Sequence, residues 1–433
     1  MRHWLKDDSF RSLVRNTSYL AVSKAVSAVA GIATLAFAGR TLGLVEFGLL
    51  ILIASYAQAA SGLTRFQSWQ LIIRYGGAAL TSGDDATFRR SIGFGLGLDA
   101  SSGIAGMAAA MLLLPLIGPW TGIGGDLIAT AMVYCLLVPT MGAATPIGVL
   151  RALDRFDLIG WQGTVTPIFR AVLAGIGWWQ GWPLPAFVAI WFVTDLGGDL
   201  FLWFLAGREL KRKDMHSGIR PTLRPSGLPG AWPFAIQVNV HSSLMSAWGP
   251  VARVIIGGLL GPASAALYRV ASSLADSAQK PADLLAKAYY PEVVRMDLKT
   301  KHPWRLMLRG TAMASAFGIA AVLIVLLIGK WLLATLFGAD FVPAYPVLLV
   351  LVGVPLLWMV GFPLTPMLYA LDRADAPLKA RAVGTVVYLA IVAPLSWRFD
   401  VAGAAVALLI GNLVIVALMM AQLRVQYWKV RGR

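Results

Sequence analysis

Apolar stretches recur along the whole chain, and they limit its fold more than any other feature. A stretch of roughly 20 apolar residues is long enough to cross a bilayer as a helix. Hydrophobic residues fill 58% of the 433 positions and charged residues 13%, more apolar surface than a soluble domain can bury. The sequence therefore predicts an all-α integral membrane protein. We place twelve spans, at 17–38, 44–64, 91–117, 127–150, 159–180, 183–206, 235–256, 262–282, 309–335, 345–368, 377–398 and 401–424.

The chain also repeats itself at an offset of 218 residues. Positions 152–157 read ALDRFD and positions 370–375 read ALDRAD, and Gly43 matches Gly261 at the same offset. The last six spans follow the first six at this offset, so we predict two six-helix lobes produced by duplication. Because six is even, the lobes share one topology and are related by a pseudo-twofold axis along the membrane normal.

A polar segment separates the two halves of the chain. It reads GRELKRKDMHSGIRPTLRPSGLPG and is both basic and rich in Pro and Gly. We therefore predict an amino-terminal lobe at 1–206, a basic cytoplasmic linker at 207–230 and a carboxy-terminal lobe at 231–433.

The distribution of Lys and Arg indicates the orientation, because these residues are retained on the cytoplasmic side of short loops. With the amino terminus inside, the outside loops hold only Arg40, Lys330 and Arg398. Both termini are therefore predicted to be cytoplasmic, and the protein to be a multi-pass protein of a bacterial inner membrane. The net charge of +16 then reflects this topology and contact with anionic membrane lipids, not with nucleic acid.

The sequence argues against an enzyme. The single cysteine, Cys135, excludes a disulfide within the chain and a Cys-based metal site. A polysaccharide polymerase or ligase needs a large extracytoplasmic loop for its catalytic groups, whereas the predicted outside loops are short. We find no phosphate-binding Gly-rich loop, nucleophile triad or metal cluster in the sequence, and therefore expect transport without a catalytic residue, a metal or an organic cofactor.

Two short segments resemble a known family. AGRTLGLVEFG at 38–48 and GADFVPAY at 338–345 resemble the polysaccharide (O-antigen type) flippases of the multidrug/oligosaccharidyl-lipid/polysaccharide exporter superfamily. Helix count, length and two-lobe organisation extend the resemblance over the whole chain. It implies lobes that open alternately to either side of the membrane, as in the related multidrug transporters.

The same resemblance implies a substrate and partners. The substrate would be an oligosaccharide on a polyprenyl diphosphate, moved from the inner to the outer leaflet for polysaccharide or lipopolysaccharide biosynthesis. A polysaccharide polymerase and glycosyltransferases would be partners, and a monomer is expected.

Cations inside the predicted spans suit a diphosphate, because a low-dielectric cavity strengthens their attraction to phosphate oxygens. The candidates are Lys24, Arg253 and Arg269. In related lipid-linked precursor flippases, cavity cations occur on the first and eighth helices, which matches Lys24 and Arg269 by helix and sign. Asp276 shares a polar face with Arg269. Alternatively, Lys24 and Arg253 lie close enough to span ends to reach lipid headgroups.

Acidic residues inside the spans indicate either ion coupling or internal ion pairs. Asp195 and Asp199 are four residues apart on one helix face, so their repulsion in a shared wet site would suit binding of H⁺ or Na⁺. We favour the other interpretation, an ion pair with Arg170 on the preceding helix. Asp99 faces either the cytoplasmic vestibule or a coupling site.

ALDRFD and ALDRAD each follow the fourth span of a lobe, so we place them in cytoplasmic turns. Their acidic residues suit the cap and the dipole of the next helix. We favour a structural turn retained after duplication, and the alternative is a gate between the lobes. The residues concerned are Asp154, Arg155, Asp372 and Arg373.

The alternative function is a cation-coupled multidrug antiporter of the same superfamily. Such a protein is expected to place carboxylates in the amino-terminal lobe for cationic drugs. The first span has Lys24 and no acid, but Asp99, Asp195 and Asp199 keep the antiporter open.

Overall fold

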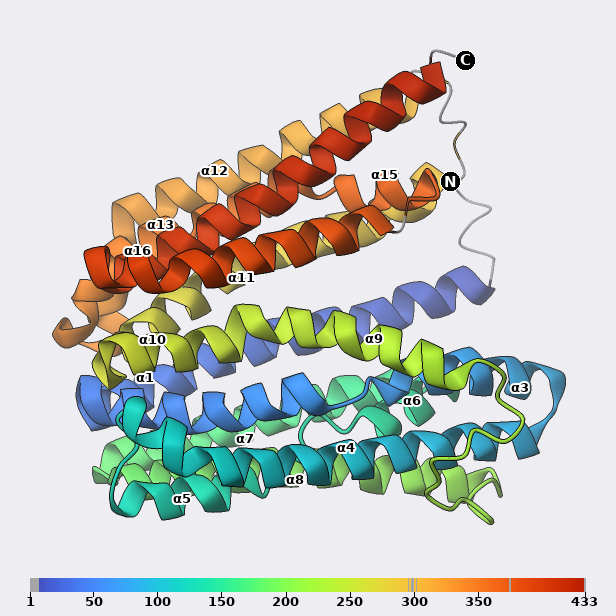
Figure 1. Ribbon diagram of the computed structural model, residues 1–433, viewed down its shortest axis with the longest axis horizontal. Helices are drawn as coiled ribbons and strands as arrows, with labels where there is room; N and C mark the ends of the chain where they lie inside the picture. Colours follow the sequence, from blue (N-terminus) through green and yellow to red (C-terminus); the bar gives the residue numbers. More distant parts are fainter. Residues whose placement is uncertain (1–7, 295, 297–299, 301, 374, 432–433) are drawn as a thin grey trace. The chain divides into compact units, whose positions relative to one another are not determined.

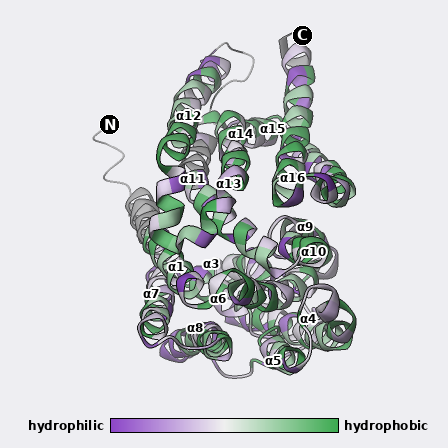
Figure 2. Ribbon diagram, turned by 90° about the vertical axis from the view of Figure 1, so that its left-hand side faces the viewer, coloured by the Kyte–Doolittle hydropathy of each residue, from purple (hydrophilic) through white to green (hydrophobic). Residues whose placement is uncertain are grey.

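The computed structural model describes residues 8–294, 296, 300, 302–373 and 375–431. All regular elements among these residues are helices (Figure 1), and apolar residues predominate along the long ones (Figure 2). By length and composition, 7 helical stretches of this described part can cross a membrane. The predicted class, an all-α integral membrane protein, is therefore confirmed.

The chain folds into two compact units. The first contains the described residues of 1–42, 53–119 and 123–246. Most of α1 belongs to it, and α9 belongs to it by contacts with α2. Its helices are α1 (Asp8–Thr64), α2 (Ser68–Leu71), η2 (Ile72–Gly76), α3 (Gly77–Ser82), α4 (Asp85–Trp120), α5 (Asp126–Cys135), α6 (Ala144–Ala152), α7 (Phe156–Gln180), α8 (Leu184–Arg212) and α9 (Ala231–Ser246).

The second unit contains 43–52, 120–122 and the described residues of 247–433. Since these units are defined by contacts and the predicted lobes by the repeat, the lobe boundaries at 206 and 231 stay a prediction. The helices of the second unit are η3 (Ala247–Val251), α10 (Ala252–Leu260), α11 (Pro262–Val294), α12 (His302–Phe337), η4 (Ala339–Ala344), α13 (Tyr345–Leu351), α14 (Gly353–Gly361), α15 (Leu364–Ala370) and α16 (Asp375–Arg431).

The predicted spans lie on helices or on runs of shorter helices. Two spans share α1 and two share α16, because each of these helices continues through a kink, at Gly43 in α1 and at Phe399 and Asp400 in α16. The spans at 127–150 and 345–368 are instead divided among several short helices. The count of twelve spans therefore stays a prediction.

The repeat extends to backbone conformation. Gly43 and its counterpart Gly261 both have positive φ, 68° and 87°, a conformation that glycine adopts without a Cβ clash. In ALDRFD, the N–H groups of Asp154 and Arg155 bond back to carbonyls of the preceding helix at 3.1 and 2.8 Å. In ALDRAD, those of Asp372 and Arg373 do so at 3.1 and 2.9 Å.

These bonds form the same helix ending, a Schellman motif, in both copies. The left-handed residue of this motif is an aspartate each time, with φ of 57° at Asp154 and 56° at Asp372. Aspartate tolerates this conformation better than most residues, because its short polar side chain can hydrogen-bond locally. Two copies of one polar hexapeptide thus specify two copies of one helix ending.

An ion pair follows the turn in each copy. The Nε atom of Arg155 is 2.9 Å from Oδ1 of Asp157, and that of Arg373 is 3.0 Å from Oδ1 of Asp375. The expected acidic cap is absent from α7, whose N-cap is Arg155, because the Asp157 carboxylate binds this arginine instead. Asp157 lies in the first turn of α7, where its negative charge interacts favourably with the dipole of this helix. Arg155 also pairs with Glu209 of α8 at 2.5 Å, which ties the turn to that helix.

The segment between α8 and α9 is held along α4 within the first unit (Figure 1). The N–H of Thr222 donates to the carbonyl of Gly93 at 3.0 Å. A Cβ at Gly97 would lie 2.2 Å from the carbonyl oxygen of Thr222, so only glycine permits this approach. Leu228 of the same segment is buried. We call the segment 220–228 the strap.

The Arg155–Asp157 pair predicts that stability depends on pH. The Arg155 guanidinium holds the pKa of the Asp157 carboxyl below its ordinary value. Such a carboxyl stabilises the fold above its unfolded pKa, about 4, and loses this contribution as pH falls through the folded pKa. Asp157→Asn should therefore lower the free energy of unfolding by a few tenths to about 1 kcal/mol near neutral pH, and by progressively less in acid. Thermal unfolding in detergent between neutral and acid pH measures the difference, and a difference that does not shrink contradicts the prediction.

Because the strap lies directly against Gly97, a single added methyl group at this position should displace it. Gly97→Ala should destabilise the protein by about 1–3 kcal/mol, as overpacking does, and should expose the strap to thermolysin on the amino side of Leu223. Gly207→Ala is the matched control, because a Cβ at this α8 glycine meets nothing within 4 Å. Thermal unfolding and limited proteolysis check both variants. Equal behaviour of the two would show that the strap does not depend on Gly97.

Candidate functional site

A buried carboxylate joins three helices of the first unit. Asp99 of α4 is buried, and its Oδ2 accepts hydrogen bonds from Ser68 Oγ (2.8 Å), Thr145 Oγ1 (2.7 Å) and the backbone N–H of Thr145 (3.0 Å). Ser68 begins α2 and Thr145 lies in the first turn of α6, so this oxygen satisfies helix-end donors. The other oxygen, Oδ1, has no hydrogen-bond partner among the described residues.

An arginine lies beside this carboxylate. Arg65 follows the last residue of α1 and is close enough to Asp99 and Asp199 to interact electrostatically. Its guanidinium lies against Gly142, where a Cβ would be 2.1 Å from Nη1. The backbone N–H of Gly142 in turn donates to the Asp199 carboxylate. Gly142 has φ of 76°, so both its conformation and its close contact with Arg65 require glycine.

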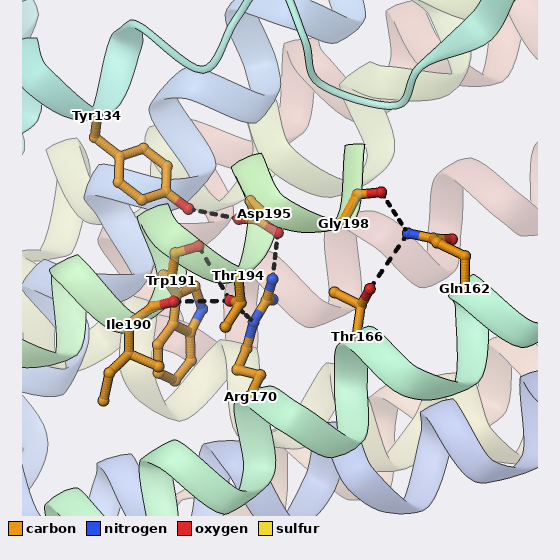
Figure 3. A network of polar contacts seen from close by, with 9 residues as sticks. All are labelled: Tyr134, Gln162, Thr166, Arg170, Ile190, Trp191, Thr194, Asp195 and Gly198. Atoms are coloured by element: carbon orange, nitrogen blue, oxygen red, sulfur yellow. Dashed lines mark hydrogen bonds and ion pairs between the residues drawn. The ribbon is translucent and has the colours of Figure 1, made fainter. Parts of the chain in front are cut away.

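A second ion pair lies between α7 and α8 (Figure 3). Arg170 pairs with Asp195 through Nη2 and donates from Nε to Thr194 Oγ1 at 2.7 Å. The other Asp195 oxygen accepts from the Tyr134 hydroxyl at 2.9 Å. Both oxygens of Asp195 are thus engaged, as in the internal ion pair considered from the sequence. Asp195 also interacts electrostatically with Asp199, which links the two pairs.

We call these five charged residues the acidic cluster: Asp99, Asp195, Asp199, Arg65 and Arg170. Three carboxyl groups face two guanidinium groups, so the set carries one excess negative charge when all are ionised. A proton or a monovalent cation would balance this charge. Among the described residues, no group of three or more His, Cys, Asp or Glu side chains could hold a metal ion.

The second unit contains a set of charged residues whose net charge is positive, opposite in sign to that of the acidic cluster. Arg253 of α10 is 8% exposed and interacts electrostatically with Arg269, Asp276 and Tyr268 of α11. Two guanidinium groups and one carboxyl group give the three charged residues a net charge of +1. We call Arg253, Arg269 and Asp276 the cationic cluster. Arg253 is buried, Arg269 half-buried and Asp276 exposed. A site with this charge balance suits an anion with several oxygens, such as a phosphate, because guanidinium can bind such oxygens in pairs.

The structure brings together some of the residues singled out from the sequence and assigns others to different units. Arg253, Arg269 and Asp276 meet in the second unit, whereas Lys24 lies on α1 in the first unit with an exposed side chain. Asp154 and Asp372 are exposed at their turns, and their role as a gate stays a prediction.

Sequence reasoning missed Arg65, Gly142 and Tyr134. Arg65 directly follows the predicted span at 44–64, and this position predicts a cation in a cytoplasmic loop. Its Nε atom is buried, so the side chain turns into the protein there. Gly142 between Met141 and Ala143 was an available signal, since glycine inside a predicted span marks a bend or a close approach.

Comparison with known proteins supports a membrane transporter fold. No protein-family model matches the chain. It is 37% identical over 347 residues to the inner membrane protein YghQ of Escherichia coli (strain K12), a match that covers 80% of this chain and 98% of YghQ. The protein is accordingly a multi-pass inner-membrane protein.

Solved structures show the fold. An inward-facing MATE family multidrug resistance transporter of the MOP superfamily superposes with a TM-score of 0.73 at 14% identity, covering 94% of this chain and 96% of that one. The lipid II flippase MurJ superposes with a TM-score of 0.65 at 11% identity, covering 95% and 89%. The Vibrio cholerae MATE transporter VcmN gives 0.63 at 15% identity, covering 98% of each chain. The chain belongs to the family of the inner membrane protein YghQ, and it has the fold shared by the MATE transporters and MurJ.

Proposed function

We propose that this protein is an alternating-access transporter of the MOP superfamily that moves a polyprenyl-diphosphate-linked oligosaccharide from the inner to the outer leaflet. The observation that carries the proposal is the cationic cluster of Arg253, Arg269 and Asp276. Its net positive charge in the second unit suits the diphosphate of such a lipid. Likeness in fold to MurJ, a lipid II flippase, supports a lipid-linked substrate.

The cost of burying charge supports this choice of substrate. An arginine inside a membrane segment costs several kcal/mol unless it meets a partner or water. Two arginines that interact with each other add repulsion to that cost. An anionic substrate would relieve this repulsion, and a cationic drug would increase it. In this proposal the lobes at 1–206 and 231–433, joined at 207–230, alternate around the substrate.

The acidic cluster would supply coupling. Its excess carboxyl charge in the first unit suits H⁺ or Na⁺, while the Arg170–Asp195 pair holds α7 and α8 together. In this division of roles, the second unit binds the anionic lipid and the first responds to the driving ion. A polysaccharide polymerase and glycosyltransferases would act before and after the flippase, which works as a monomer.

Glycan delivery tests the proposed flippase. Cells without their own polysaccharide flippase should regain glycan on the outer surface when they produce the wild type, and should lose most of it with Arg253→Gln/Arg269→Gln. Adding Lys24→Ala tests the third predicted cation. Arg398→Gln/Arg424→Gln is the matched control, because both arginines are exposed on α16 and their replacement removes the same two charges. Surface glycan is measured at equal protein levels, and full delivery by the double variant would refute the cationic site.

The alternative, a multidrug antiporter, rests on the acidic cluster. If it were correct, cells producing the protein would accumulate less of a cationic dye, and Asp199→Asn would abolish the effect. For a flippase we expect unchanged dye accumulation, while Asp199→Asn should lower glycan delivery about tenfold or more, as loss of a coupling carboxyl would. Dye fluorescence and surface glycan, measured on the same cells, separate the two functions.

A further inference from the structure

One face of α16 carries polar and aromatic side chains inside the second unit. Arg381, Thr385 and Tyr388 are spaced by four and three residues, which places them on the same side of the helix. Thr385 and Tyr388 are buried, although they lie in an apolar helix. Such a face is costly in a membrane protein unless it packs against polar partners or binds a polar ligand.

Trp248 of η3 contacts this face directly. Its ring stacks on Tyr388 with centroids 5.0 Å apart, and its Nε1 donates to Thr385 Oγ1 at 2.9 Å. The indole is therefore fixed both by stacking and by a hydrogen bond. The Tyr388 hydroxyl is fully buried and has no hydrogen-bond partner among the described residues. Because Tyr388 has no exposed surface, what it contributes to this face is the aromatic ring that holds the indole of Trp248.

The indole N–H of a second tryptophan also donates a hydrogen bond inside this unit. Trp358 of α14 donates from Nε1 to Asn412 Oδ1 at 2.9 Å, and Asn412 is buried. The guanidinium of Arg381 lies 5.2 Å from the centre of the Trp358 ring. Both indoles thus have their N–H groups satisfied inside the unit, and both remain partly exposed. Aromatic faces next to Arg, Thr and Asn offer apolar contact and hydrogen bonds together.

This face is connected to the cationic cluster. Tyr388 interacts electrostatically with the buried Tyr268, which adjoins Arg253. In the second unit, the cationic cluster is therefore followed by Tyr268 and Tyr388, and these two tyrosines are followed by the two tryptophans. A substrate in which a diphosphate is followed by a sugar has the same order of chemistry.

We propose that Trp248, Trp358 and Arg381 form a sugar subsite that takes the pyranose ring attached to the diphosphate, with Tyr388 holding Trp248 in position. The inference rests on the proposed flippase function and names a further part of its site. The apolar face of the ring would pack on the partly exposed indoles, and its hydroxyl groups would bond to Arg381. The subsite makes the transporter prefer a sugar-bearing lipid over the bare polyprenyl diphosphate.

Binding measurements on the purified full chain in nanodiscs test this subsite. The two probes are undecaprenyl diphosphate and undecaprenyl-diphosphate N-acetylglucosamine, which differ by one sugar. The wild type should bind the sugar-bearing lipid about tenfold more tightly, equivalent to about 1.4 kcal/mol. Trp358→Leu and Arg381→Gln should each reduce this ratio towards one and leave the affinity for undecaprenyl diphosphate unchanged.

Trp397→Leu is the matched control, because this α16 tryptophan is 72% exposed and lies outside the subsite. Arg253→Gln/Arg269→Gln should weaken both lipids equally, which separates the two parts of the site. Equal affinity of the wild type for both lipids would overturn the subsite and leave the diphosphate site standing. A preference that persists in both Trp358→Leu and Arg381→Gln would also overturn it. If neither lipid binds the wild type, the proposed function fails together with the subsite.

Discussion

The lack of water inside a bilayer is the constraint on which the rest of this structure depends. Helices satisfy their own backbone groups, and every polar side chain within them must find a partner in the protein or face a wet cavity. The three bonds to one oxygen of Asp99 and the Arg170–Asp195 pair show one solution, in which donors come from neighbouring helix ends and side chains. In the cationic cluster, two guanidinium groups and one carboxyl group interact with one another within the second unit.

The duplication distinguishes the structural features that both halves share from the features that only one half has. The Schellman turns and the left-handed glycines occur in both halves, because each half must end and restart its helices at the same points. The charges inside the predicted spans do not repeat: at the same offset Asp99 corresponds to Phe317 and Arg269 to Ile51. The two halves therefore keep one backbone plan while their interiors have acquired opposite charge. Carboxyl groups are in excess in the acidic cluster, and guanidinium groups are in excess in the cationic cluster.

The sequence was sufficient for the helical membrane class, because apolar length and charge placement depend only on local composition. It was also sufficient for the repeated turn, since Asp154 and Asp372 lie within a recognisable hexapeptide. It could not place Arg65, whose burial depends on Gly142 about eighty residues later in the chain. Nor could it reveal Trp248 against Tyr388, because apolar periodicity treats both simply as membrane-span residues. Contacts between distant helices decide the site, and a single sequence does not encode them in any local pattern.

The strap contacts α4 through backbone atoms, and this has a consequence for divergence among relatives. Carbonyl oxygens such as that of Thr222 are present whatever side chain the strap carries, so its sequence can drift while the glycines of α4 cannot. The length of the strap, in contrast to its sequence, cannot vary, because an inserted residue would move the Thr222 carbonyl away from Gly97. Among relatives that keep this contact, glycines at 93 and 97 should accompany a strap of constant length and variable composition. A reporter peptide would likewise be accepted at the exposed turn around Gly218, before the strap begins, but not within 220–223.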